Sequence, residues 1–210
     1  AVTPAGWGLP AMLNCLRKGE PLEASVFDCP AQGKEYRRRP VPKTNQFRDL
    51  FRSPRLRRAS PVSRYLAAAA FEALGQRPID EICLDSFRLG IVVSCYTGCV
   101  NYSQRFYSEV LDNPQTASPI IFPETVFNAP SSHLSALLAS AEINYTLVGD
   151  ESQFLSAIEL GVNWVLDDGL DAVLVAAAEE IDWLSAEGLS MFVNAPVIAE
   201  GAAALLLEPC

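Results

Sequence analysis

Four short apolar runs, set between longer helical patterns, constrain the fold of this chain more than any other feature of its sequence. The runs are Leu89–Cys95, Tyr145–Val148, Ala172–Ala178 and Ala202–Leu207. Because they are short and carry no charge, they predict strands buried on both faces. Buried strands that alternate with helices predict an α/β fold, in which a mostly parallel sheet is layered with helices. A flavodoxin-like doubly wound sheet is the alternative, but its first turn would lack a phosphate loop.

Helical patterns fill the intervals between these runs. Ser60 followed by Pro61 is typical of a helix N-terminus, and Gly75 is typical of the end of that helix. Further helices are predicted over Gly98–Leu111, over Val126–Leu138, and from Asp150 or Glu151 to the residue before Gly169. Residues 29–60 are rich in Pro and Arg, so we expect an insertion or a long loop there.

The composition is that of a folded protein, because 50% of the 210 residues are apolar and 20% are charged. These fractions exclude a disordered chain and favour a single domain over residues 1–210. No charge-free apolar run approaches the roughly 20 residues of a membrane span, and no signal-peptide pattern opens the chain. The six cysteines show no CxxC spacing. We therefore expect reduced thiols and a cytoplasmic location.

Charge is distributed unevenly along the chain. The net charge is −9, yet ten of the 16 basic residues lie between Arg37 and Arg64, where Asp49 is the one acid. No Lys or Arg follows Arg105. An acidic protein of this kind binds nucleic acid poorly, whereas the basic segment can hold one acidic partner. The alternative is that the basic segment is a solvated, partly mobile loop.

Common catalytic patterns are absent from the sequence. His133 is the single histidine, so neither a multi-histidine metal site nor a pair of acid–base histidines can form, and we expect no metal. The patterns GxGxxG, GxxxxGK[ST], GxSxG and HExxH do not occur, which excludes the usual nucleotide, esterase and zinc-protease sites. A lone histidine near a helix start is more often a packed or capping residue than a catalyst.

Two carboxylates open the predicted helix that follows the second apolar run. Asp150 and Glu151 lie where unpaired N–H groups give the helix N-terminus a positive potential. In the simpler interpretation they cap the helix and favour its first turn, each contributing about 0.3–1 kcal/mol. A functional role for Glu151 needs support from a resemblance.

The order of seven segments resembles the N-terminal half of β-ketoacyl synthases of the thiolase-like fold. The segments are residues 1–8 (AVTPAGWG), Ser63–Leu74, Leu89–Leu111, Ser118–Ser135, Ile143–Ile158, Asp171–Glu180 and Glu200–Pro209. They span nearly the whole chain. The resemblance implies a single β-ketoacyl synthase N-terminal-like domain with the fold of a thiolase-like half.

Two departures from the family imply that this chain does not catalyse condensation. By the resemblance, Glu151 stands where an active synthase has the cysteine that accepts the acyl chain. A carboxylate there would form an anhydride, which water destroys. The family's two catalytic histidines come from a second half, and His133 belongs to neither of their motifs. The resemblance therefore implies no catalytic residue, with Glu151 as a degenerate nucleophile position.

The chain length factor subgroup of the family also lacks the acyl-accepting cysteine. Its members pair with an active ketosynthase and shape the far end of the partner's acyl tunnel. The stretch Gly98–Tyr107 is similar to the helix that closes this tunnel. Val100, Ser103 and Tyr107, spaced for one helix face, are then the acyl-tunnel gate. The alternative is that these three residues make core contacts within the subunit.

The resemblance thus implies a non-catalytic subunit in polyketide, fatty-acid or aryl-polyene-type biosynthesis. Its partners would be an active β-ketoacyl synthase, in a heterodimer, and an acidic acyl carrier protein held by Arg55, Arg57 and Arg58. The ligand of the complex would be a phosphopantetheine-bound acyl chain. For the subunit itself we expect no cofactor, no bound nucleic acid and no membrane span. Malonyl-thioester decarboxylation and a purely scaffolding role are the alternatives.

A half-length chain of this family would expose apolar surface, which marks a site of association. The mean hydropathy of +0.15 agrees with that expectation. The chain does not begin with Met, so a naturally short chain and part of a longer one both stay open. The sequence also leaves open which acyl chain is made, which ketosynthase is the partner, and whether the chain forms homo-oligomers. It does not assign the roles of Glu151 and His133.

Overall fold

The predicted strands are all present in a computed structural model of the chain, which describes residues 1–29, 33–75, 87–150 and 152–209. They are β5 (Leu89–Cys95), β6 (Asn144–Val148), β7 (Ala172–Glu179) and β9 (Gly201–Leu207), each within one residue of its predicted ends. The predicted helices are α3 (Pro61–Ala73), α5 (Val100–Asp112), α6 (Ala129–Leu137) and α7 (Gln153–Leu166). The Ser60 side chain accepts the N–H of Ser63 and caps α3 as expected.

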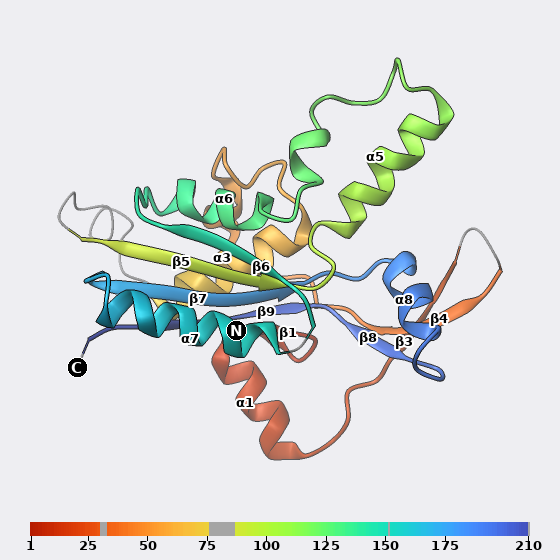
Figure 1. Cartoon of the computed structure of the whole chain (residues 1–210). Coiled ribbons are helices and arrows are strands. Elements are labelled where there is room, and N and C mark those ends of the chain that lie inside the picture. The colour runs from red at the N-terminus through yellow and green to blue at the C-terminus, as the bar shows by residue number, and fades with distance from the viewer. Residues whose placement is uncertain (30–32, 76–86, 151, 210) are drawn as a thin grey trace.

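The predicted strands belong to one six-stranded sheet, in the order β2-β1-β9-β7-β5-β6. Strands β1 (Val2–Thr3) and β2 (Gly6–Trp7) form its far edge. β5 is parallel to both β6 and β7, as expected, but β9 runs antiparallel to β7 and to β1. The chain between β7 and β9 turns at the end of the sheet instead of crossing its face, so β9 returns in the opposite direction (Figure 1).

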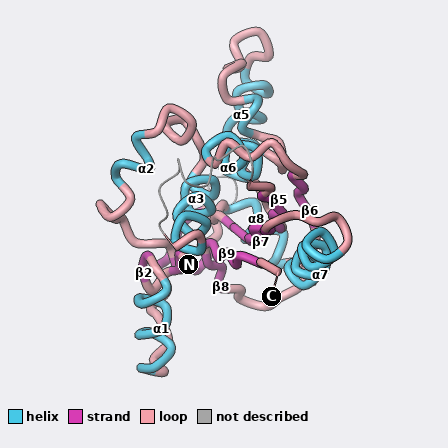
Figure 2. Tube along the Cα trace, turned by 90° about the vertical axis from the view of Figure 1, so that its left-hand side faces the viewer, coloured by secondary structure: helices cyan, strands magenta, loops and turns pink. Residues whose placement is uncertain are grey.

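Helices cover both faces of this sheet, so the α/β layered class is confirmed. Figure 2 shows α3 and α6 on one side of the strands and α7 on the other. The side chains of β5 and β7 alternate between the two layers, as pleated strands require. Leu89, Ile91 and Val93 pack with α3 and α6, whereas Val92 packs with Val175 and α7. Every residue of β5 is buried, which explains its charge-free sequence.

Helix α7 has a buried face and an exposed apolar face. Gly161 lets the helix approach the sheet closely, because a Cβ there would lie 2.8 Å from Cγ2 of Val175. On the opposite side, Leu155, Val162 and Leu166 follow at helical spacing and are exposed, Leu155 by 69% and Leu166 by 72%. This outward stripe is covered by nothing within the part of the chain that the structure describes.

The expectation of a loop over residues 29–60 is corrected by the structure. The segment contains strand β4 (Glu35–Arg39) and helix α2 (Arg48–Arg52). β4 pairs with β3 (Ser25–Asp28) and β8 (Val197–Ala199) in a small second sheet. Tyr36 on β4 is buried, and the guanidinium of Arg38 lies 5.0 Å from the ring centroid of Phe27. This cation–π contact shows how an arginine of the basic segment can pack on a neighbouring strand.

Helices α1 (Leu9–Lys18) and α8 (Trp183–Ser190) complete the described structure, and α8 packs on the small sheet. No helix in the described ranges has the length and apolar character that crossing a membrane requires. Four of the cysteines, Cys15, Cys29, Cys95 and Cys99, are free thiols. Cys83 and Cys210 lie outside the described residues.

Candidate functional site

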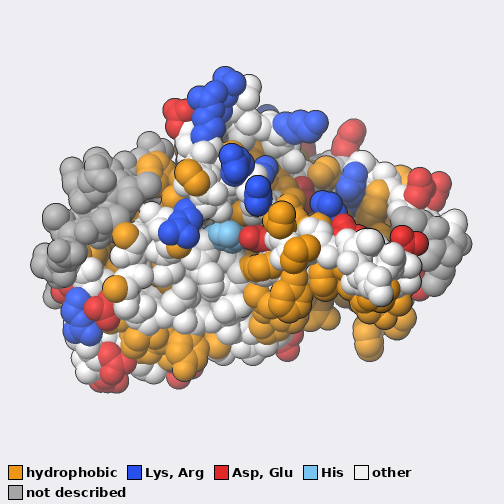
Figure 3. All heavy atoms as spheres, turned by 90° about the horizontal axis from the view of Figure 1, so that it is seen from above, with side chains coloured by type: hydrophobic (Ala, Val, Ile, Leu, Met, Phe, Trp, Pro, Cys, Tyr) orange, Lys and Arg blue, Asp and Glu red, His pale blue; other side chains and the backbone are white. Residues whose placement is uncertain are grey.

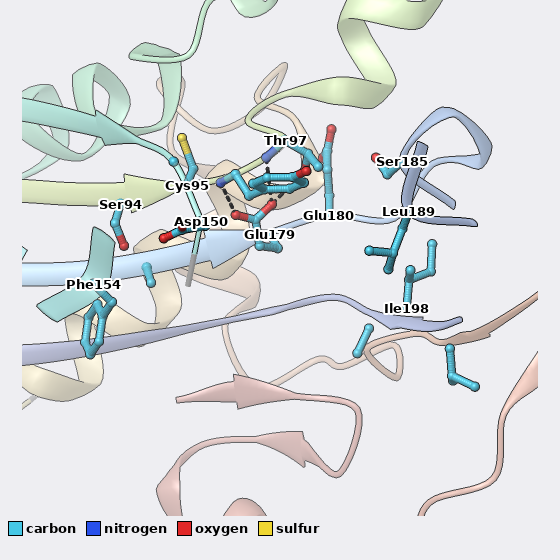
Figure 4. Close-up of a pocket in the computed structure, with 15 residues that line it drawn as sticks. Ser94, Cys95, Thr97, Asp150, Phe154, Glu179, Glu180, Ser185, Leu189 and Ile198 are labelled. Carbon is cyan, nitrogen blue, oxygen red and sulfur yellow. Dashed lines mark hydrogen bonds between the residues drawn. The ribbon is translucent and has the colours of Figure 1, made fainter. Parts of the chain in front are cut away.

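The carboxyl ends of β5, β6 and β7 meet at one edge of the large sheet, beside a cavity of about 540 Å³. Figure 4 shows its walls, which come from the strand ends, from α7 and from α8 with β8. Its apolar lining includes Phe154, Leu189 and Ile198. Its polar lining includes Asp150, Glu179 and Glu180. Ligands of open α/β sheets bind at this edge, so these carboxylates decide what the cavity can do.

Glu179, the last residue of β7, binds the turn that follows β5. The N–H of Tyr96 donates to one of its carboxylate oxygens. The other oxygen accepts the Thr97 N–H at 3.1 Å and the Thr97 hydroxyl at 2.6 Å. Figure 4 marks these bonds with dashed lines. Because both oxygens accept hydrogen bonds from this turn, Glu179 positions it.

Glu180 follows directly and is only 3% exposed. Its Oε1 accepts the N–H of Asn101 at 2.8 Å, and its Oε2 accepts the N–H of Val62 at 3.1 Å. Burial raises the pKa of Glu180 to about 7, a shift that the two hydrogen bonds oppose and the nearby charge of Glu200 favours. The carboxylate therefore caps α5 and α3 at the same time.

The thiols near the cavity are not nucleophiles at neutral pH. Burial raises the pKa of Cys95 to about 12, and the charge of Glu179 adds to the shift. Burial also raises the pKa of Cys99 to about 12. The Cys99 Sγ lies 3.3 Å from the Ser60 hydroxyl. The thiolate is the reactive form, so neither residue can accept an acyl group without a large change of environment.

The turn before α7 is described except at Glu151, which lies outside the described residues. Asp150 does not cap α7 as the sequence suggests. Its carboxylate instead accepts the N–H of Ser152 at 2.9 Å and the Ser152 hydroxyl at 2.6 Å, and these bonds lower its pKa. The helix begins only at Gln153, so the carboxylate is one turn too early to reach its N–H groups.

His133 lies on α6 and pairs with a carboxylate. Its Nε2 is 2.8 Å from Oε2 and 2.9 Å from Oε1 of Glu124, in the short helix η1 (Phe122–Glu124). The pair joins α6 to η1, and His133 lines neither of the cavities described here. Within the described residues, no group of three or more His, Cys, Asp or Glu side chains could hold a metal ion.

The three residues predicted as the tunnel gate line one open groove of about 380 Å³ on α5. Val100, Ser103 and Tyr107 share its wall with Phe106 and Leu184, among others. The Ser103 hydroxyl lies within hydrogen-bond distance of the Cys99 and Thr125 carbonyl oxygens, at 3.1 and 3.0 Å. Tyr107 is 64% exposed. No residue of α5 is buried among the described residues.

The residues of the predicted carrier-protein patch lie in the turn between α2 and α3. Arg55, Arg57 and Arg58 are all exposed. The hydroxyl of Tyr102 on α5 donates to the Arg58 carbonyl oxygen at 3.0 Å. The basic turn therefore adjoins the base of the helix that carries the groove.

Sequence reasoning assigned no role to Glu179 and Glu180. A signal for them exists, because two carboxylates follow a buried strand in a half of the chain that has no Lys or Arg. Buried charges need partners, and without cations those partners must be N–H or O–H groups. Two solvent-exposed carboxylates would give the same sequence, so the pattern alone does not show whether Glu179 and Glu180 bind backbone groups.

The sequence matches one family model. The model described as Beta-ketoacyl synthase, N-terminal domain, matches residues 21–210. None of the curated proteins matches the chain.

Solved structures of ketosynthase assemblies share the fold. The ishigamide ketosynthase/chain length factor superposes with a TM-score of 0.74 at 18% identity, over 100% of this chain and 60% of that chain. The ketosynthase ApeO in complex with its chain length factor ApeC, from Xenorhabdus doucetiae, superposes with a TM-score of 0.60 at 19% identity. The match covers 82% of this chain and 65% of that chain. AntDE:AntF, a type II PKS acyl-carrier protein in complex with its ketosynthase, superposes with a TM-score of 0.75 at 15% identity. The match covers 99% of this chain and 55% of that chain. This chain spans about 55–65% of the length of those chains.

The ionisation of Glu180 is expected to make the stability of the chain depend on pH. The folded state keeps this proton up to a pH of about 7, whereas an unfolded glutamate loses it near 4.5. The folded state therefore binds more protons in this window, and the free energy of unfolding falls as pH rises through it, by up to about 1.4 kcal/mol per pH unit. Urea denaturation at a series of pH values measures this slope.

The matched variants are Glu180→Gln, which removes the slope between pH 5 and 7, and Glu200→Gln, which keeps most of it because burial is the largest cause of the raised pKa. A slope that is equal in wild type and Glu180→Gln would contradict the assignment.

Proposed function

The chain belongs to the β-ketoacyl synthase family through its N-terminal domain, and from that premise we propose that it is a non-catalytic subunit of the chain length factor type. In this role it pairs with an active β-ketoacyl synthase and shapes the acyl tunnel of that partner. One observation carries the proposal: Val100, Ser103 and Tyr107, predicted to be the gate, lie together along a single open groove.

The chemistry of the described residues supports a role without covalent catalysis. Acyl transfer from a thioester needs a nucleophile, and burial holds Cys95, which lines the cavity, and Cys99, the N-cap of α5, as thiols. Glu179 and Glu180 are occupied by backbone N–H groups. By the resemblance, Glu151 stands where the family has its acyl-accepting cysteine.

Two uncovered surfaces support pairing with another subunit. The outward stripe of α7, formed by Leu155, Val162 and Leu166, is apolar and exposed. Among the described residues β6 is the last strand of the sheet, with no strand beside its outer edge, and Tyr145 and Val148 on it are exposed. Exposed apolar patches and free strand edges both favour association. Similar structures include a ketosynthase in complex with its chain length factor, which supports a ketosynthase as the partner.

The basic turn supports recruitment of an acidic carrier protein, which brings the phosphopantetheine-bound acyl chain. Arg55, Arg57 and Arg58 are exposed beside the base of α5. Figure 3 shows Lys and Arg side chains gathered on this side of the molecule, next to an apolar area. A similar structure contains an acyl-carrier protein bound to its ketosynthase. The proposed pathway class is therefore polyketide, fatty-acid or aryl-polyene biosynthesis.

The gate is tested by Tyr107→Ala in the complex with the ketosynthase that copurifies with the chain. Removing the phenol ring enlarges the groove, so the product distribution is expected to shift towards chains at least one extension unit longer. Mass spectrometry of the released products measures the distribution. Leu111→Ala is the control, because Leu111 is exposed one turn further along α5 and does not line the groove. An unchanged distribution in Tyr107→Ala would leave only a scaffolding role.

The carrier patch is tested by reversing two charges. Arg57→Glu with Arg58→Glu is expected to weaken binding of the carrier protein to the complex about tenfold, since losing two surface pairs costs about 1.4 kcal/mol. Surface plasmon resonance at low and high salt measures the change, which salt should diminish. Arg17→Glu with Lys18→Glu on α1 makes the same change of charge elsewhere. Equal binding by both double variants and wild type would refute the patch.

A further inference from the structure

Helix α5 begins without a cap from its own sequence. Its N-cap residue, Cys99, makes no side-chain bond to the first turn. The N–H groups of a first helical turn have no partner within the helix, so they need one from elsewhere. For Asn101 that partner is Glu180, at the end of β7 and far away in sequence, with an N–H to Oε1 bond of 2.8 Å.

The same carboxylate also holds a second helix. The Val62 N–H at the start of α3 donates to Oε2 at 3.1 Å. Each oxygen of Glu180 thus serves a different helix, and the side chain is almost fully buried. Bonds to a buried carboxylate are stronger than those between neutral groups, so the two helix starts are tied firmly to the end of β7.

Glu179 restrains the turn that leads into α5. Its bonds to Tyr96 and Thr97 fix the turn just before the helix begins. Two successive residues of β7 therefore hold both the approach to α5 and its first turn.

Beyond its first turn, α5 is held by contacts near the surface. The Tyr102 hydroxyl donates to the Arg58 carbonyl oxygen, the Phe106 ring packs against Phe122, and the Ser118 N–H donates to Glu109. None of its residues is buried, and the helix projects from the body of the protein, away from the large sheet (Figure 1). Its direction therefore depends on these contacts together with its first turn, where Glu180 ties the helix to the end of the large sheet. Tyr107 lies about 10 Å along the axis from Val100, so a tilt of about 6° at the first turn moves it by about 1 Å.

We propose that Glu180, supported by Glu179, is a positioning residue for chain length: by fixing the start of α5 it fixes the width of the groove formed by Val100, Ser103 and Tyr107. The inference rests on the proposed function, because the groove matters only if it limits an acyl chain. Glu180 does not line the groove, so it acts on the groove through the helix.

Glu180→Gln tests the inference sharply because an amide has the same shape but one acceptor oxygen. It can serve either Asn101 or Val62, and its NH₂ then faces the other N–H. Glu200→Gln is the matched control. Glu200 Oε1 accepts both the Val41 N–H at 2.8 Å and the Tyr65 hydroxyl at 2.9 Å, so an amide oxygen can keep both bonds. Both variants remove one buried or half-buried charge, but only the first leaves a helix N–H without its acceptor.

The first measurement is amide hydrogen exchange on the chain in its complex, at pH 8, where Glu180 is ionised. Glu180→Gln is expected to raise exchange in the first turn of α5 or α3 by roughly tenfold or more, the effect of losing a bond to a charged group. Glu200→Gln should leave both turns unchanged. Equal exchange in wild type and Glu180→Gln would overturn the inference.

The second measurement is the product distribution of the complex, normalised to total product. A merely structural residue would lower the total without changing the ratio of long to short products. Glu180→Gln is expected to change that ratio at least twofold, and Glu200→Gln is expected to preserve it. A change of equal size in both variants would overturn the inference, since the lost charge and not the lost acceptor would then be the cause.

Tyr107→Ala separates this inference from the proposed function. If Tyr107→Ala changes the ratio and Glu180→Gln does not, the inference is wrong and the proposed function stands. If neither changes it, the groove does not limit the product and both are wrong. Should Glu180→Gln fail to fold, Glu179→Gln takes its place, because its amide can still serve Thr97 while it loses Tyr96. A smaller change of the same ratio is then expected, and an unchanged ratio overturns the inference.

Discussion

Burial of β5 and β7 on both faces is the constraint on which the rest of the structure depends. Each strand is clamped between α7 on one side and α3 with α6 on the other, so neither can carry a charge along its length. Polar side chains can leave this core only at the strand ends. At the carboxyl end of β7 two glutamates follow in succession, and the N-terminal ends of α3 and α5 converge on the second of them. The core thus determines where the helices begin.

The balance of charge explains why these carboxylates bind backbone groups. The chain beyond Arg105 has no Lys or Arg, so Glu179 and Glu180 have no cation from their own half. Helix N-termini and a tight turn supply the N–H groups instead, with their favourable dipoles. The arrangement occupies the carboxylates that face the cavity and leaves the thiols beside them protonated. An edge that serves catalysis in many α/β proteins is therefore suited here to positioning.

The sequence predicted those helices and strands whose residue pattern follows directly from burial. β5 was predicted to the residue, because a short apolar run of this kind fits only a doubly buried strand. β4 was missed, since arginines look solvated in sequence although the guanidinium of Arg38 lies over the Phe27 ring of the neighbouring strand. The three groove residues were expected together from a resemblance and do line one groove, whereas Glu180 could not be identified. Its role depends on two helix starts that lie far from it in sequence and meet only in the folded chain.

The central claim is that this chain gives shape to a reaction that another subunit performs. The most direct test is the intact mass of both subunits after the complex is incubated with an acyl-loaded carrier protein. We expect the acyl mass on the ketosynthase alone, and no change in the mass of this chain with or without its partner. A stable acyl adduct on this chain would contradict the account.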